Sequence, residues 1–334
     1  MTEPHLLAVD GGGTSTTAWI TNRAGRVLGR GAAGPANAKL VGLNRARANL
    51  HDAIANAFLN AGQGVQPPAE MACFGLAGFD RPDDQHVIGS WSESVRWSRR
   101  MMLVNDGDMV LAAGTPQGYG IGLIAATGSI AVGRNLAGST ARAGGWGHLI
   151  GDEGGAYSVA LAALRRIART ADGREPQPAG SGDPLTRRVC EALGLTEPSG
   201  LVSLIYSRSF DPARIASLAP TVVAAAEEDP TITDRILIPA GRELARCVAA
   251  VTRTLGGPIA FPRPIPLAIS GSFLLSAKHV MRALLDQLAN WKIPVSASVV
   301  AEPVIGALIL AQRTMEGESP RTWIRSELEE TVVL

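Results

Sequence analysis

Lysine is scarce in this 334-residue chain. Only Lys39, Lys278 and Lys292 occur, so arginine provides 28 of the 31 basic side chains. Chemistry that depends on lysine therefore has few candidates, and the chain contains no Gly-x-x-x-x-Gly-Lys-Ser/Thr run. The formal net charge is only +1. This argues against a nucleic-acid partner, because a polyanion is held by a large surplus of basic side chains.

Cysteines and long apolar runs are also few. Cys73, Cys190 and Cys247 are far apart and odd in number, a pattern that fits neither a disulfide framework nor a local metal site. We expect them to be buried thiols. No run of 18 apolar residues occurs, and no basic leader precedes the first strand, so we expect a soluble, cytoplasmic protein without a membrane partner.

Glycine is abundant by contrast, with 38 copies, and 46% of the residues are hydrophobic. A chain of this composition can bury a large core, which excludes a disordered protein. The length favours two domains and leaves room for a ligand cleft.

The first part of the chain predicts three opening strands followed by alternating helices and strands. The order is βββαβαβα, with strands at 5–9, 14–21, 26–31, 71–76 and 101–105 and helices at 43–61, 83–95 and 106–114.

A second series repeats this order with helices inserted after its third strand. Strands are expected at 121–126, 129–133, 139–143, 267–270 and 295–300, and helices at 153–171, in several pieces up to 255, and at 276–289 and 303–313. The repetition suggests a duplication. We expect one lobe at 1–117, a second at 118–302 with a helical insertion at 153–256, and a closing segment, 303–334, able to pack back on the first lobe.

Two glycine turns can hold phosphate. Asp10 ends the first strand and is followed by Gly11, Gly12, Gly13 and Thr14. Glycines let backbone N–H groups converge on an anion, and the carboxylate can hold Mg²⁺. Thr127-Gly128-Ser129 repeats the device at the start of the second half. The alternative is two ordinary tight turns, the first with a capping aspartate.

Asp106 follows an apolar strand and begins a helix. A carboxylate at the carboxyl end of a strand in an open α/β sheet points to the crevice where ligands bind, and could take a proton from a substrate hydroxyl. Helix capping alone would also explain this aspartate.

The densest motif is the run from Gly144 to Gly155. Trp146 offers an aromatic platform for a sugar face, and Asp152 is a better ligand candidate than Glu153, which could simply begin the next helix. His148 is interpreted as a packed or solvated side chain. The turn at Gly271 and Ser272 could lie against a nucleotide base or ribose, although such turns are common.

These motifs, in this order, resemble the N-acetylglucosamine kinase and BadF/BadG-type ATPase family of the actin, Hsp70 and hexokinase superfamily. The resemblance implies an α/β, two-lobed actin-like ATPase (ribonuclease H-like) fold with ATP and Mg²⁺ as cofactors. It implies that Asp106 is the catalytic base and Asp10 the metal ligand. It also implies nucleotide contacts at Gly12, Gly13, Thr14, Thr127, Gly128, Ser129, Gly271 and Ser272, and amino-sugar contacts at Asn37, Asp106, Gly145, Trp146 and Asp152.

The function expected is transfer of phosphate from ATP to the 6-hydroxyl of N-acetylglucosamine or glucosamine, by a homodimer. Ala126 stands where the family commonly has glycine, and Ile130, Ala77 and Ala143 depart from the residues of the animal-type kinases, which leaves the choice of amino sugar open. A sugar or nucleotide sensor without catalysis is the alternative from another class. A BadF-type ATPase activator is a further one, disfavoured because the Cys-rich loops of such activators are missing.

Overall fold

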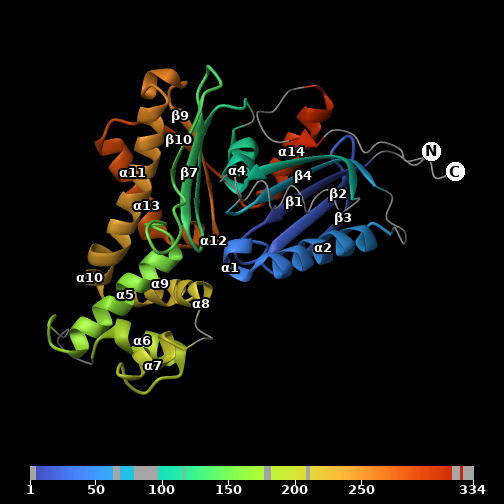
Figure 1. The fold of residues 1–334 in the computed structure, drawn as a ribbon. Helices are drawn as coiled ribbons and strands as arrows, with labels where there is room; N and C mark the ends of the chain where they lie inside the picture. Colours follow the sequence, from blue (N-terminus) through green and yellow to red (C-terminus); the bar gives the residue numbers. More distant parts are fainter. Residues whose placement is uncertain are drawn as a thin grey trace. The chain divides into compact units, whose positions relative to one another are not determined.

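The computed structural model describes residues 5–62, 68–78, 97–115, 117–176, 182–207, 211–317 and 324–325. It divides into two compact units: unit 1 is Met1–Pro116 with Val300–Leu334, and unit 2 is Gln117–Val299 (Figure 1). The helix expected at 83–95 lies outside the described residues, as does most of 318–334.

Unit 1 is built on a mixed sheet in the order β11-β5-β4-β1-β2-β3. The first three strands form an antiparallel meander, as expected, whereas β1, β4 and β5 run parallel. The strands are β1 (His5–Gly11), β2 (Thr16–Asn22), β3 (Val27–Ala33), β4 (Ala69–Leu76), β5 (Ser98–Asn105) and β11 (Ile324–Arg325). Parallel strands place their carboxyl ends at one edge, so the residues that follow β1, β4 and β5 share that edge.

Helices cover both faces of this sheet (Figure 1). Leu7 and Val9 pack in one core cluster with α2 (Leu43–Asn60), whereas Leu6 and Ala8 pack in another with α14 (Val304–Met315). Alternate residues of a strand point to opposite faces, so the two helices lie on opposite sides of β1. The other helices in the described part of unit 1 are α1 (Ala38–Val41) and α4 (Asp106–Gly114).

Unit 2 repeats the arrangement in the sheet β10-β9-β6-β7-β8. Its first three strands again form an antiparallel meander, and β6, β9 and β10 run parallel. The strands are β6 (Gly120–Ala125), β7 (Ser129–Arg134), β8 (Thr140–Gly144), β9 (Ile265–Ser270) and β10 (Val295–Val299). The repeated topology confirms the expected duplicated actin-like fold.

The helical insertion of unit 2 owes several of its boundaries to one device. Asp183, Asp211 and Asp229 each accept a hydrogen bond from the backbone N–H of the first helical turn, and each is followed by a proline. Aspartate is a preferred N-cap, and proline fits the first helical position because the N–H it lacks would be unpaired there. The insertion comprises α5 (Ala156–Ala171), α6 (Pro184–Leu193), α7 (Gly200–Ile205), α8 (Pro212–Ala216), α9 (Ala219–Ala226), α10 (Pro230–Ile232), the π-helical turn η1 (Thr233–Leu237) and α11 (Ile238–Thr254).

Beyond the insertion, the helix expected at 276–289 is α13 (Lys278–Asn290). A short helix that was not expected, α12 (Ser272–Ser276), precedes it, and Ala277 between them has a non-helical ψ of 77°. A short 3₁₀ turn, η2 (Pro258–Ala260), precedes β9.

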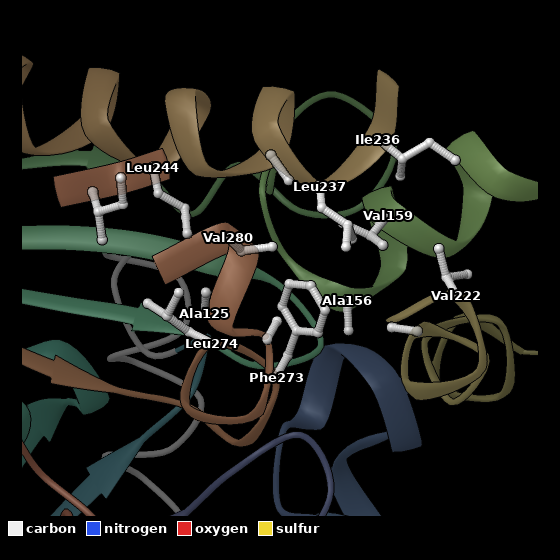
Figure 2. Close-up of a cluster of buried hydrophobic side chains, with 14 of the residues drawn as sticks. Ala125, Ala156, Val159, Val222, Ile236, Leu237, Leu244, Phe273, Leu274 and Val280 are labelled. Carbon is white, nitrogen blue, oxygen red and sulfur yellow. The ribbon is translucent and has the colours of Figure 1, made fainter. Parts of the chain in front are cut away.

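The core of unit 2 joins the insertion to the sheet. Figure 2 shows Phe273 and Leu274 of α12 among side chains of β6, α5, η1, α11 and α13, including Ala125, Ala156 and Val280. These residues are almost completely buried. The turns that carry the candidate site of unit 2 are therefore attached to a closely packed core.

The three cysteines carry no disulfide. Cys73 and Cys190 are buried, and Cys247 is half-buried. Within the described part of the chain, no helix combines the length and apolar character needed to cross a membrane.

Candidate functional site

Two predicted carboxylates share one edge of the unit 1 sheet. Asp10 lies at the end of β1, beside Gly75 of the parallel strand β4, and Gly75 in turn pairs with Val104 of β5. Asp106 comes two residues after Val104. Burial, together with the negative charge of Asp106, raises the pKa of Asp10 to about 7. The two carboxyl groups are therefore close enough to repel each other, which indicates a place for positive charge.

Asp106 is not the N-cap that helix capping alone would require. The cap of α4 is Asn105, whose Oδ1 accepts a hydrogen bond from the N–H of Gly107 at 2.9 Å. Asp106 is the first helical residue, and its Oδ1 lies 3.0 Å from the same N–H. Because Asn105 already caps α4, helix capping does not explain an aspartate at position 106. Its carboxylate lies in the first turn of α4, at the positive end of the helix dipole.

The glycine turn after Asp10 is tied to two other segments of unit 1. The N–H of Gly12 donates to the carbonyl of Ser15, and the Gly12 carbonyl accepts from the N–H groups of Ala36 and Asn37 at 3.0 and 3.2 Å. The Gly11 carbonyl accepts from Ala77 at 2.9 Å. These bonds gather the Asp10 turn, Asn37 and the end of β4 at one edge. Thr14 is exposed at the tip of the turn, and Gly13 beside it is half-buried.

Asn37, expected to contact the amino sugar, also caps a helix. Its Oδ1 accepts from the N–H of Lys39 at 3.0 Å and so caps α1. A Cβ on Gly78 would lie 3.0 Å from that oxygen, and Gly78 has a φ of 78°. Glycine at position 78 therefore leaves the space that Asn37 occupies.

In unit 2, the turn at Thr127–Ser129 lies at the N-terminus of α5. The N–H of Ala156 donates to the carbonyl of Ala126 at 2.8 Å, and that of Tyr157 to the carbonyl of Thr127 at 3.0 Å. The positive end of the α5 dipole therefore faces this turn, which favours an anion nearby. The hydroxyl of Ser129 donates to the carbonyl of Glu153 at 2.7 Å, so this side chain braces the neighbouring loop.

Asp152 joins that neighbouring loop, Gly144–Gly155, to the Thr127–Ser129 turn. Its Oδ1 accepts from the N–H of Gly147 at 3.2 Å, and its Oδ2 would lie 2.3 Å from a Cβ on Gly128. Burial raises its pKa, while backbone hydrogen bonds from Gly147 and Ser129 act in the opposite direction. Asp152 adopts a φ of 60°, a left-handed conformation that is strained for most residues.

Trp146 is displayed rather than buried. The residue is 58% exposed, and a Cβ on Gly151 would lie 2.6 Å from the Trp146 Cβ, so only glycine at 151 leaves room for it. His148 packs edge-on against Tyr157 at 5.1 Å between ring centroids, in agreement with the packed interpretation. Glu153 does not begin α5, which starts at Ala156 after a turn through Gly154 at a φ of 82°.

The Gly271 turn lies directly beside β6. Gly271 has a φ of 106°, and a Cβ there would come within 2.3 Å of the Ala125 carbonyl oxygen. Ser272 begins α12 and is exposed. A cavity of about 430 Å³ lies next to this turn, lined mainly by apolar side chains: Leu274, Leu275, Lys278, Met281, Arg282, Leu285, Asp286 and Val299. This volume is within the range of ligand pockets.

Arg142 is the site residue that the sequence analysis missed. Its Nη2 donates to the carbonyls of Gly144 at 3.3 Å and Gly145 at 3.2 Å. The only sequence signal for Arg142 was an arginine two residues before a glycine run.

The capping role of Asn105 was also missed. Asparagine directly before Asp106 could have indicated it, because asparagine is a preferred N-cap.

The structure thus gathers Asp10, Asp106, Asn37 and the first glycine turn within unit 1. Within unit 2 it gathers the Thr127–Ser129 turn, the Gly144–Gly155 loop and the Gly271 turn. Among the described residues, no cluster of three or more His, Cys, Asp and Glu side chains forms a complete metal cage.

Comparison with known proteins assigns the chain to a family. The model of the BadF/BadG/BcrA/BcrD ATPase family matches residues 7–311. The chain is 32% identical to the N-acetylmuramic acid/N-acetylglucosamine kinase of Clostridium acetobutylicum, over 75% of this chain and 80% of that relative. It is 27% identical to the N-acetyl-D-glucosamine kinase of Dictyostelium discoideum, over 93% of this chain and 98% of that one.

A solved structure agrees. The crystal structure assigned as an N-acetylglucosamine kinase from Chromobacterium violaceum is 27% identical and superposes with a TM-score of 0.72, covering 92% of this chain and 99% of that one. The family match extends over nearly the whole chain and confirms the resemblance drawn from its motifs. The chain belongs to the BadF/BadG/BcrA/BcrD ATPase family.

Proposed function

We propose that the protein is an ATP-dependent amino-sugar kinase that phosphorylates N-acetylglucosamine or glucosamine at the 6-hydroxyl. The observation that carries the proposal is the pair of carboxylates, Asp10 and Asp106, at the ends of parallel strands in unit 1. Relatives named as kinases of N-acetylglucosamine and N-acetylmuramic acid support the substrate class.

Asp106 is the proposed catalytic base. Its place at the start of α4, after a strand end, is typical of side chains that face a ligand in α/β proteins. In phosphoryl transfer the protein mainly positions the groups and accepts the proton of the attacking hydroxyl. The Asp106 carboxylate would take that proton from the sugar, while the capping of α4 is left to Asn105.

Asp10 is the proposed metal ligand. Two crowded carboxylates, one of them with a pKa of about 7, form an arrangement that a divalent cation would relieve. Magnesium is held in kinases by one or two carboxylates together with substrate phosphates, so the absence of a larger acidic cluster among the described residues fits it. When bound, Mg²⁺ neutralises charge on the phosphate oxygens. Asp10 would hold it, and Asp106 would remain available for the proton.

The nucleotide contacts are proposed for the glycine turns of both units. Gly13 and Thr14 in unit 1, with Thr127 and Gly128 in unit 2, offer backbone N–H groups and hydroxyls to phosphates. Gly12, whose N–H donates to the carbonyl of Ser15, is proposed to let the backbone approach the phosphates closely. The α5 dipole favours an anion at Thr127–Gly128. The apolar cavity beside Gly271 and Ser272 offers surface for a purine ring.

The sugar contacts are proposed for Asn37 in unit 1 and for Gly145, Trp146 and Asp152 in unit 2. An exposed indole can stack on the apolar face of a pyranose, and a carboxylate can accept hydrogen bonds from its hydroxyls. Ile130 fills the space behind Gly145, since a Cβ on Gly145 would lie 2.8 Å from its Cδ1. This apolar neighbour is one reason to test acetylated and free amino sugars side by side.

A coupled ADP-release assay tests the proposal. It compares N-acetylglucosamine, glucosamine, N-acetylmuramic acid, N-acetylmannosamine and glucose, with phosphorus NMR of the product to locate the phosphate. The Asp106→Asn variant is expected to lose about 10²- to 10⁴-fold in kcat while it still binds ATP, because only proton acceptance is removed.

The matched control is Asp108→Asn, which removes a negative charge from the same first turn of α4 and should keep kcat within about twofold of wild type. Wild-type-like turnover in Asp106→Asn would remove this residue from the mechanism. Nucleotide binding without ADP release on any sugar would replace the kinase with a non-catalytic sensor.

A further inference from the structure

Arg142 holds the first turn of the Gly144–Gly155 loop. It lies in β8 opposite Val132 of β7, and its Nη2 donates to two successive carbonyls, those of Gly144 and Gly145. Hydrogen bonds from a charged donor are stronger than neutral ones. One guanidinium nitrogen therefore binds two successive peptide groups at the start of the loop.

The two glycines need such a restraint. Gly144 and Gly145 have φ values of 76° and 67°, and glycine loses more conformational freedom on folding than any other residue. The peptide between them is clamped on both sides, because its carbonyl accepts from Arg142 while its N–H donates to the carbonyl of Ser129 at 2.9 Å. Alanine at position 145 would be strained, because φ is 67° there and its Cβ would lie 2.8 Å from the Cδ1 of Ile130.

The second carbonyl sets the direction of the residue that follows. In a planar trans peptide the C=O and N–H groups point in opposite directions. Because the Gly145 carbonyl is turned to Arg142, the N–H of Trp146 points away from Arg142. Arg142 thereby holds the orientation of the peptide that joins Gly145 to the exposed Trp146.

We propose that Arg142 is a positioning residue for sugar binding, acting through Gly145 and Trp146 without contacting the sugar itself. The inference rests on the proposed kinase function. It differs from a general structural role, because the restraint acts on the loop proposed to hold the sugar. The nucleotide and the transfer step depend on other residues of the chain.

Steady-state kinetics of Arg142→Met, Arg142→Lys and the control Arg134→Met test the proposal, with calorimetric titration of the sugar as a direct measure of binding. Arg134 lies in β7, and the backbone register pairs it with Thr140 at the other end of β8 from Gly144. Arg142→Met is expected to raise the KM and the Kd for the sugar at least about tenfold, with kcat and the KM for ATP within twofold. Arg142→Lys should rescue part of the loss, because an ammonium can still donate to one carbonyl, and Arg134→Met should match wild type.

The outcomes separate the two proposals. If wild type releases no ADP and binds no sugar of the panel, the kinase function fails and this inference fails with it. If wild type is active but Arg142→Met keeps the sugar KM and Kd within twofold, only the positioning role is overturned. A loss of kcat and melting temperature with unchanged sugar Kd would also overturn it, because that pattern indicates a purely structural role.

Discussion

The candidate regions of the two units are built from different material. In unit 1 the important groups are charged side chains, Asp10 and Asp106, placed at the ends of parallel strands. In unit 2 they are backbone groups, shaped by glycines with positive φ and held by hydrogen bonds between the Thr127–Ser129 turn and the Gly144–Gly155 loop. The candidate region of unit 1 therefore depends on charged side chains, and that of unit 2 depends on backbone conformation.

The difference teaches where a substitution should act. A carboxylate such as Asp10, whose pKa is raised by its surroundings, lowers the stability of the fold when it is ionised. A functional role explains why such a residue is present. A glycine turn is the reverse case, because its conformation is part of the folded structure. We therefore expect changes in unit 1 to reduce turnover without loss of folding, and changes in unit 2 to affect folding or substrate binding.

The largest expected effects are on transfer, and Asp10→Asn should act on the same scale as Asp106→Asn. Transfer in Asp10→Asn should fall about 10³-fold, because the proposed Mg²⁺ ligand is lost. The same variant should melt at a higher temperature than metal-free wild type at pH 8. The folded-state pKa of about 7 lies above the ordinary value of 3.8, so ionising Asp10 weakens the fold progressively as the pH rises from about 4 to about 7.

Thermal melts of both proteins with chelator, at pH 5 and pH 8, check this sign. The gap between Asp10→Asn and wild type should widen toward pH 8, and added MgCl₂ should raise the melting temperature of wild type only. A difference in melting temperature that is larger at pH 5 than at pH 8 would contradict the inference that ionised Asp10 destabilises the fold.

The next effect concerns the geometry of unit 2. Gly271→Ala places a Cβ 2.3 Å from the Ala125 carbonyl oxygen at a φ of 106°, and it should lower the free energy of unfolding by roughly 3–5 kcal/mol. The matched control is Gly138→Ala, at a φ of 78° with no atom within 4 Å of the added Cβ. The control carries the backbone strain alone and should cost about 1–2 kcal/mol.

Urea unfolding of the two variants measures the difference directly. If Gly271→Ala and Gly138→Ala were equally destabilised, the close approach of the Gly271 turn to β6 would not contribute to the stability of unit 2.

The contrast between charge and geometry also explains what could be predicted from sequence. Alternating strands and glycine turns are local patterns, so both three-stranded meanders were predictable, as was the placement of Asp10 and Asp106 at strand ends. The parallel pairing that brings these two carboxylates together follows from the α/β order.

The details of unit 2 depend on contacts distant in sequence. The start of α5 moves from Glu153 to Ala156 because Ser129 holds the Glu153 carbonyl and Gly154 adopts a positive φ, neither of which is a local preference. The bond from Arg142 to the Gly145 carbonyl depends on the path of a loop, not on a sequence period. Geometry that arises from tertiary contacts was therefore the part that sequence reasoning missed.

The smallest effect should come from Asp152, which has both properties, since it is a carboxylate in a left-handed conformation that joins two loops. Asp152→Asn keeps a side chain that tolerates this φ but weakens acceptance from Gly147, so the sugar KM should rise about tenfold with folding nearly unchanged. Asp152→Ala should show the same rise in KM together with a loss of about 1–2 kcal/mol in unfolding free energy. Kinetics and urea titrations of the two variants separate the contributions. If both variants lost kcat and kept the sugar KM, Asp152 would act in transfer, as Asp10 and Asp106 are proposed to do. Charged side chains and backbone conformation would then not be divided between unit 1 and unit 2.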